Sequence, residues 1–135
     1  LTDGSLLFNE LSPRPHDTGM VTMISQHYSE FALHALAILG VPVTANYTEL
    51  SLKNNEVAAS HAIVIKAEGS VGFTNIAQAL QSGENYRCNL RIFAKPSVHG
   101  HRRMAVSLAT GLTQEEAREN ATRVAISLKT TQTNA

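Results

Sequence analysis

The feature that most constrains the fold is a change of hydrophobic pattern around residue 43. Before it, apolar residues recur at helical spacing: Tyr28, Phe31, Ala32, Ala35, Leu36 and Leu39. Residues three, four and seven apart share one face of a helix, so this spacing predicts one amphipathic helix over residues 25 to 39. Gly40 and Pro42 follow in the order that ends a helix. After residue 57 the apolar residues instead form short runs, which predict strands.

A short apolar run also precedes the helix. Leu6-Leu7-Phe8-Asn9-Glu10 follows a turn signal and predicts a buried strand. Ser12-Pro13-Arg14-Pro15 ends this strand, because each proline biases the residue before it away from helix. The segment is expected to leave the strand as a stiff extended loop. Since the chain opens at Leu1 without an initiator methionine, we expect a fragment of a longer protein.

The second half of the chain predicts a small mixed domain after a linker at residues 43 to 57. Strands are expected at residues 60–67, 87–94 and 103–109, with a short helix from a cap at Thr74 to about Gln81. Residues 130 to 135 are expected to form a polar tail. The whole chain is therefore α+β: a strand, loop and helix, then a linker, then strands closed by a helix.

The closing helix has the clearest start signal in the chain. Thr113 and Glu116 match a capping box, in which the threonine oxygen accepts a backbone N–H and the glutamate reaches back to the cap. The residues that this helix is expected to bury share one face: Ala117, Ala121, Val124, Ala125 and Leu128.

Composition excludes several classes of function. Lys plus Arg number 11 and Asp plus Glu number 11, so no global field would recruit nucleic acid or an anionic membrane. No apolar run is long enough to span a bilayer. The single cysteine, Cys88, cannot form an internal disulfide and fits a reducing cytoplasm. His99 and His101 lie close together, but a metal site needs three or four ligands, and their turn holds no Asp, Glu or Cys.

Ionisable groups concentrate in the segment that follows the first predicted strand, NELSPRPHDTG. Its glutamate, Glu10, supplies a hard oxygen ligand of the kind that suits Mg²⁺. This ion usually keeps several waters and binds one or two carboxylates plus substrate phosphates. The alternative is that Glu10 only pairs with Arg14 at the end of the strand, because one glutamate alone is a weak metal signal.

A second group of charges lies in the segment KPSVHGHRR, between two predicted strands. Its proline and glycine are turn residues, so a hairpin is expected. The hairpin would bring Lys95 alongside Arg102 and Arg103, and three cations at one end of a sheet make a local site for phosphate or carboxylate. The alternative is a solvated basic hairpin without a ligand.

Two stretches resemble a known family. NELSPRPHDTGMVTMISQHYSEFALHALAILGVPV resembles the end of the ATP-grasp domain in formate-dependent phosphoribosylglycinamide formyltransferases, and LRIFAKPSVHGHRRMAVSLAT resembles part of their C-terminal domain. The resemblance implies that residues 1–42 end an ATP-grasp domain. Residues 43–57 would then be a linker, and residues 58–135 a small C-terminal domain.

The resemblance also implies a reaction and its site. ATP would activate formate, as formyl phosphate, for attack by the amine of glycinamide ribonucleotide in purine biosynthesis. Glu10 would stand at a Mg²⁺-ligand position, and Asp17, Lys95, Arg102 and Arg103 at positions that hold the ribonucleotide. The family further implies a cytoplasmic homodimer. His99 replaces an acidic residue expected in this hairpin.

The other residues that contact ATP would lie upstream of Leu1, so we expect the chain by itself to be inactive. Two other functions remain open. The sister ATP-grasp enzyme that carboxylates an aminoimidazole ribonucleotide tends to carry Asn at the position of Asp17, then Ser-Gly-His in place of Thr18-Gly19-Met20. A non-catalytic module that binds a phosphorylated metabolite or a partner chain is the second.

Overall fold

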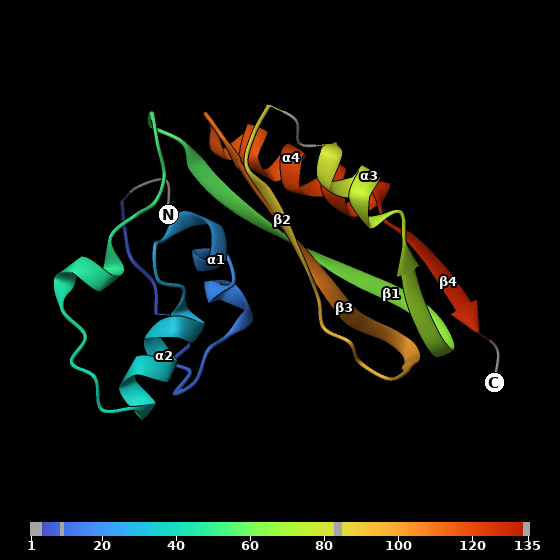
Figure 1. Ribbon diagram of the computed structural model, residues 1–135, viewed down its shortest axis with the longest axis horizontal. Coiled ribbons are helices and arrows are strands. Elements are labelled where there is room, and N and C mark those ends of the chain that lie inside the picture. The colour runs from blue at the N-terminus through green and yellow to red at the C-terminus, as the bar shows by residue number, and fades with distance from the viewer. Residues whose placement is uncertain (1–3, 9, 83–84, 134–135) are drawn as a thin grey trace.

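The computed structural model describes residues 4–8, 10–82 and 85–133. A four-stranded antiparallel sheet with the order β2-β3-β1-β4 carries the helices, which confirms the α+β class (Figure 1). The elements, with 3₁₀ helices written η, are η1 (Asp17–Gly19), α1 (Thr22–Ser25), α2 (Glu30–Ile38), η2 (Ala45–Thr48), β1 (Val57–Thr74), α3 (Ile76–Gln81), β2 (Cys88–Ile92), β3 (Val98–Gly111), α4 (Gln114–Ser127) and β4 (Lys129–Thr133).

Strand β3 is the centre of the molecule and is covered on both faces. Successive side chains of a strand point to opposite faces. The hydroxyl of Ser107 donates to the carbonyl of Ala121 in α4 at 2.7 Å. The next residue, Leu108, is fully buried and packs against Ile24 of α1 on the other side. Alternation along β3 therefore joins the C-terminal helix and the N-terminal segment to one sheet.

Helix α4 forms as its sequence predicts. The Thr113 hydroxyl accepts the N–H of Glu116 at 3.1 Å, which confirms the threonine cap. The Glu116 carboxylate reaches one residue further back than expected and accepts the N–H of Leu112 at 2.7 Å. Its fully buried face consists of Ala117, Asn120, Ala121 and Val124. Ala125 and Leu128, expected in this set, are only partly buried. Asn120 is buried because its amide donates to the carbonyl of Thr110 at 2.9 Å.

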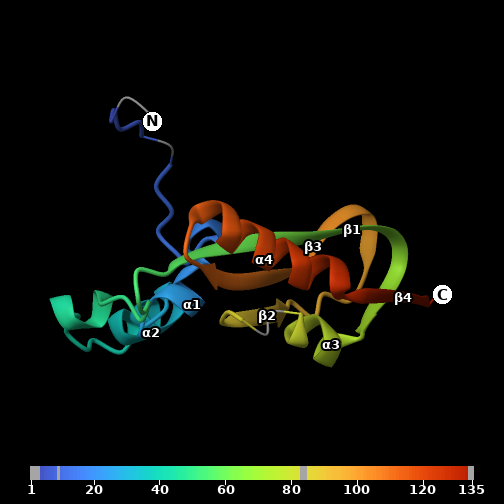
Figure 2. The ribbon, with the colours of Figure 1, turned by 90° about the horizontal axis from the view of Figure 1, so that it is seen from above.

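The predicted N-terminal strand is wrong over the residues that the structure describes. Residues 5–8 have no regular structure, and Leu6 is 96% exposed. Figure 2 shows this part of the chain standing away from the body. A strand needs a neighbour for its N–H and C=O groups, and no strand in the described ranges pairs with this one. Asn9 lies outside the described residues.

The predicted helix over residues 25 to 39 begins later than expected. Ser29 caps α2, its hydroxyl accepting the N–H of Ala32 at 3.3 Å, while Gln26 forms a β-bridge with Leu50. The end of the helix is confirmed, because Gly40 has a φ of +69°, the left-handed conformation typical of a residue just past a helix.

The predicted polar tail is wrong for residues 130–133. They belong to β4, which pairs with Ser70–Thr74 at the end of β1. Pairing uses backbone groups, so an edge strand can be polar throughout. Residues 134–135 lie outside the described part. The strands β1 and β3 also extend beyond their predicted ranges.

The cap expected at Thr74 is also wrong, because Asn75 occupies that position. Its backbone has a positive φ of 64°, and its side-chain amide donates to the carbonyl of Ser127 at 3.0 Å. None of the described helices combines the length and the apolar character needed to cross a membrane.

Candidate functional site

The loop before α1 is built onto the first turn of α2. The N–H of His16 donates to the carboxylate of Glu30 at 3.2 Å. The hydroxyl of Thr22 donates to the carbonyl of Gly19 at 2.6 Å and accepts the N–H of Glu30 at 2.9 Å. A Cβ atom at Gly19 would overlap the Glu30 carboxylate, so a larger residue here would displace that side chain. These contacts explain why residues 16–19 and the start of α2 form one unit.

Asp17 opens this loop and meets a residue far away in sequence. Its carboxylate forms an ion pair with the guanidinium of Arg103 in β3. The two side chains are 45% and 40% exposed, so solvent and ligands can reach the pair. The structure thus brings together the segment NELSPRPHDTG, through Asp17, and the segment KPSVHGHRR, through Arg103.

The hairpin between β2 and β3 is confirmed by its register, in which Cys88 faces Ala109 and Ile92 faces Ala105. The ammonium of Lys95 donates to the carbonyl of Arg103 at 2.7 Å, beside the ion pair.

Arg102 is held differently from its neighbour Arg103. Its guanidinium donates to the carbonyl of Ser97 at 2.6 Å, within the turn. Consecutive residues of a strand point to opposite faces. Arg103 therefore reaches Asp17, while Arg102 closes the hairpin and Lys95 is held on the backbone of Arg103.

A hollow of about 260 Å³ lies against the ion pair. Its walls come from η1, β1 and β3, and the residues that line it are Asp17, Thr18, Met20, Ser60, Ala62, Arg103 and Val106. A second hollow of about 230 Å³ shares Ser60 and reaches Arg118 at the start of α4. The two hollows share Ser60 of β1, and each is lined by one arginine, Arg103 in the first and Arg118 in the second.

Glu10 lies at the edge of this region. Its carboxylate is 3.3 Å from Nε2 of His16, so its partner is His16 rather than Arg14, which donates to the carbonyl of Pro15. Its side chain is 54% exposed and could provide one oxygen ligand to an ion. Within the described residues no group of three or more His, Cys, Asp or Glu side chains could hold a metal by itself.

His99 joins the hairpin turn to β1. Its Nδ1 lies 3.0 Å from one carboxylate oxygen of Glu68, and the N–H of Gly100 donates to the other at 2.8 Å. The hydrogen bond from His99 is the main cause that lowers the pKa of Glu68 below its ordinary value of 4.5. Both side chains are exposed, so the pair organises the turn from outside the hollow.

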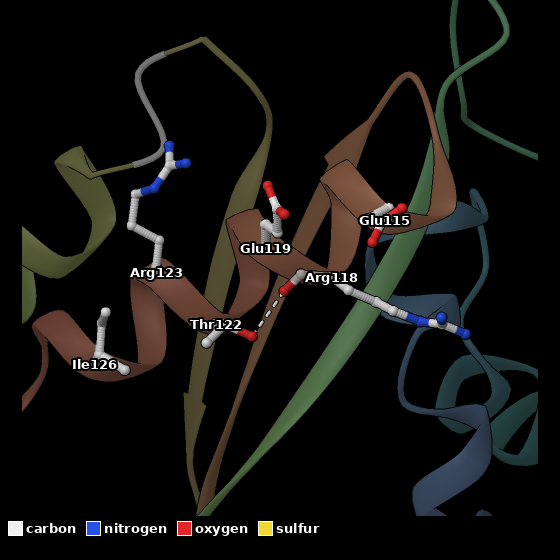
Figure 3. A pocket seen from close by; sticks show the side chains of 6 residues that line it. All are labelled: Glu115, Arg118, Glu119, Thr122, Arg123 and Ile126. Carbon is white, nitrogen blue, oxygen red and sulfur yellow. Dashed lines mark hydrogen bonds between the residues drawn. The ribbon is translucent and has the colours of Figure 1, made fainter.

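A third hollow, about 450 Å³, contains none of the predicted site residues. Figure 3 shows it on the outer face of α4, lined by Glu115, Arg118, Glu119, Thr122, Arg123 and Ile126. Mixed charges three and four residues apart are typical of a solvated helix face. Arg118 extends away from Arg123 toward β1, where it also lines the hollow of about 230 Å³ that contains Ser60.

Sequence reasoning did not single out Glu30 or the pairing of Asp17 with Arg103. The available signal for Glu30 was an acidic residue in the first turn of a helix, directly after the capping serine. That signal is common and says nothing about a loop packed above it. No local pattern connects residues 17 and 103.

Two family models match the chain. A model described as "PurT, C-terminal" matches residues 58–128, and a model of the ATP-grasp domain matches residues 1–31. The first covers more than half of the chain and contains the whole β2–β3 hairpin. The second includes Asp17 and the start of α2.

Two curated relatives with high sequence identity to the chain carry the same name. The chain is 60% identical over 131 residues to formate-dependent phosphoribosylglycinamide formyltransferase of Bifidobacterium longum, and 59% identical over 128 residues to that of Bifidobacterium adolescentis. These matches cover 97% and 95% of the chain. The chain spans about a third of the length of these relatives, 32% and 31% respectively.

Two solved structures that match the chain carry the name of a carboxyaminoimidazole ribonucleotide synthetase or of a related carboxylase subunit. N5-carboxyaminoimidazole ribonucleotide synthetase of Thermotoga maritima matches 95% of the chain and 34% of its own, with a TM-score of 0.73 and 26% identity. The phosphoribosylaminoimidazole carboxylase ATPase subunit of Aquifex aeolicus matches 93% of the chain and 37% of its own, with a TM-score of 0.67 and 26% identity.

Proposed function

This chain belongs to the PurT C-terminal family, and from that membership we propose that it is the C-terminal part of an enzyme that formylates glycinamide ribonucleotide with ATP and formate. The observation that carries the proposal is 60% identity along 97% of the chain to an enzyme of that name. The ATP-grasp domain would end with residues 1–42, and the C-terminal domain would comprise residues 58–135. The linker between them would be residues 43–57. The two family matches support this division.

The ribonucleotide site would use the charges around the first hollow. Arg103 and Lys95 would supply a bidentate fork and a point charge for the phosphate. Arg102 would add a third cation by exchanging the Ser97 carbonyl for the phosphate. Half-exposed ion pairs contribute only about 0–1 kcal/mol, so a phosphate can replace Asp17 as the partner of Arg103 at little cost. The freed carboxylate of Asp17 can then accept hydrogen bonds from the amine or the ribose of the substrate.

Glu10 would serve as one ligand of a Mg²⁺ ion. An exposed carboxylate fits the ion's preference for oxygen, with ATP phosphates, water and further carboxylates completing the shell. When bound, Mg²⁺ would neutralise charge on the phosphates during transfer. Residues outside this chain would supply the remaining ATP contacts, so the segment alone would not use ATP. We further propose a cytoplasmic homodimer.

The sister carboxylating enzyme is the second candidate, because the solved structures with this fold carry that activity in their names. Their identity to the chain is 26%, against 60% for the formyltransferase, and the loop here carries Asp17 rather than Asn. A binding module without catalysis is the third candidate. Both are separated from the main proposal by substrate tests on a complete enzyme that contains this segment.

The decisive experiment measures the Michaelis constant of each substrate for Arg103→Ala in such an enzyme. Losing one charge-assisted contact to phosphate costs about 1.5–3 kcal/mol, so the constant for glycinamide ribonucleotide should rise by roughly one to two orders of magnitude. The constant for ATP should stay nearly unchanged. Arg123→Ala, at an exposed position on α4, is the matched control.

Two results would contradict the proposal. If the arginine variant changed only the Michaelis constant for ATP, the assignment of the hairpin to the ribonucleotide site would be wrong. Turnover with bicarbonate and aminoimidazole ribonucleotide, but not with formate and glycinamide ribonucleotide, would favour the sister enzyme.

A further inference from the structure

We infer that Glu30 is a positioning residue for the substrate, because it holds the loop that carries Asp17 from beneath. The inference rests on the proposed function, in which Asp17 contacts the ribonucleotide. Glu30 itself lies at the first position of α2 and is partly buried. It touches the loop on both sides of Asp17.

Three contacts fix the loop to this glutamate. Before Asp17, the N–H of His16 donates to the Glu30 carboxylate at 3.2 Å. After Asp17, Gly19 packs so closely on the same carboxylate that an added Cβ would displace it. The hydroxyl of Thr22 then bridges the Gly19 carbonyl and the Glu30 N–H, at 2.6 Å and 2.9 Å. The Glu30 carboxylate therefore bonds the loop before Asp17 and packs on it at Gly19 after Asp17, while the Thr22 bridge ends on the backbone of Glu30.

The helix does not need Glu30 for its own cap. Ser29 already performs that role, its hydroxyl accepting the N–H of Ala32. The Oε1 atom of Glu30 is moreover buried with no hydrogen-bond partner among the described residues, which is destabilising for a carboxylate. A first-turn glutamate does suit the helix dipole. That role alone would affect stability and leave substrate binding unchanged.

The consequence for binding follows from geometry. Asp17 pairs with Arg103 across the hollow, so a displaced loop moves one wall of the site relative to the other. A misplacement of about 1 Å in a positioned group can cost on the order of 100-fold in rate. Glu30 thus influences the ribonucleotide through Asp17, without touching it.

The test uses a complete enzyme containing this segment, with Glu30→Ala, Glu30→Gln and the exposed control Glu119→Ala. Glu30→Ala should raise the Michaelis constant for the ribonucleotide by roughly tenfold or more and leave that for ATP within about twofold. Glu30→Gln should restore binding to within about threefold of the parent, because its amide oxygen can still accept the His16 N–H.

A second pair of variants guards against simple misfolding. Gly19→Ala should raise the ribonucleotide constant alone, because its Cβ displaces the Glu30 carboxylate. Gly19→Ala combined with Glu30→Ala should bind no worse than Glu30→Ala, since the overlap is gone. Fully additive effects of the two changes would overturn the inference, as would an unchanged ribonucleotide constant in Glu30→Ala.

Asp17→Asn separates the inference from the proposal beneath it. If Asp17→Asn leaves the ribonucleotide constant unchanged, the proposed site fails, whatever Glu30 does. If Asp17→Asn raises that constant while Glu30→Ala does not, only the role of Glu30 is wrong.

Discussion

The two halves of the molecule carry similar local signals and reach different degrees of burial. Helix α2 is capped by Ser29 and helix α4 by Thr113. Helix α4 buries four residues fully against the sheet, whereas α2 buries none. Large exposed apolar side chains are frequent before β1: Leu6, Leu7, Phe8, Leu11, Tyr28, Phe31, Ile38, Leu39, Val41, Val43 and Leu50.

The difference shows that a cap and an amphipathic pattern start a helix, while burial depends on a covering surface. Most helical stability in proteins comes from packing of the apolar face rather than from propensity. Strand β3 gives α4 that surface. The described part of the chain gives α2 none, and an exposed apolar patch of this kind marks a site of association. Among the described elements before β1, α1 packs on the sheet through Ile24.

The largest expected effect comes from truncating one apolar residue in each half. Leu108→Ala should lower the free energy of unfolding by about 2–5 kcal/mol, because it empties a fully buried position. Ile38→Ala, at a position that is 73% exposed, should change it by less than about 0.5 kcal/mol. Urea denaturation of the 135-residue chain measures both. Equal losses of stability in the two variants would contradict the difference in burial between the two halves.

A matched pair of cap variants tests whether α2 and α4 unfold together. Thr113→Ala removes the hydroxyl that accepts the Glu116 N–H and should cost about 1 kcal/mol in the unfolding of the sheet unit. Ser29→Ala removes the equivalent contact in α2 and should leave that transition in place. Denaturation followed by circular dichroism tests both. A shift of the main transition by Ser29→Ala would show that α2 unfolds together with the sheet.

The smallest effect is a pH dependence at the junction of the two halves. Glu56 lies directly before β1, and the N–H of Lys53 is the main cause that lowers its pKa below the ordinary value of 4.5, with Arg87 adding to it. Its contribution to stability is therefore complete above about pH 4.5. It is lost as the pH falls through the lower folded-state value.

Glu56→Gln should accordingly flatten the fall of stability below about pH 4.5. The fall will not vanish, because Glu68 and Glu116 also have lowered pKa values. Melting temperatures from pH 3 to pH 6 provide the test, with Glu119→Gln as the exposed control. A variant with the same pH profile as the parent would exclude Glu56 as a contributor.

Local sequence signals determined the features that depend on a few neighbouring residues. The helix cap at Thr113, the helix end at Gly40 and the β2–β3 hairpin are confirmed. Both segments of the proposed site were also visible in the sequence, each as a cluster of charges around a turn. Each of these features rests on contacts within one turn or one hairpin, so neighbouring residues contain the necessary information.

Only the tertiary structure decided which distant residues meet. It leaves residues 5–8 outside any strand, turns the polar end of the chain into β4, joins Asp17 to Arg103 and places Glu30 beneath the loop. Strand pairing and burial require a partner, and that partner lies anywhere along the chain or outside it. The same apolar pattern therefore predicts burial in both halves, whether or not the described residues provide a covering surface.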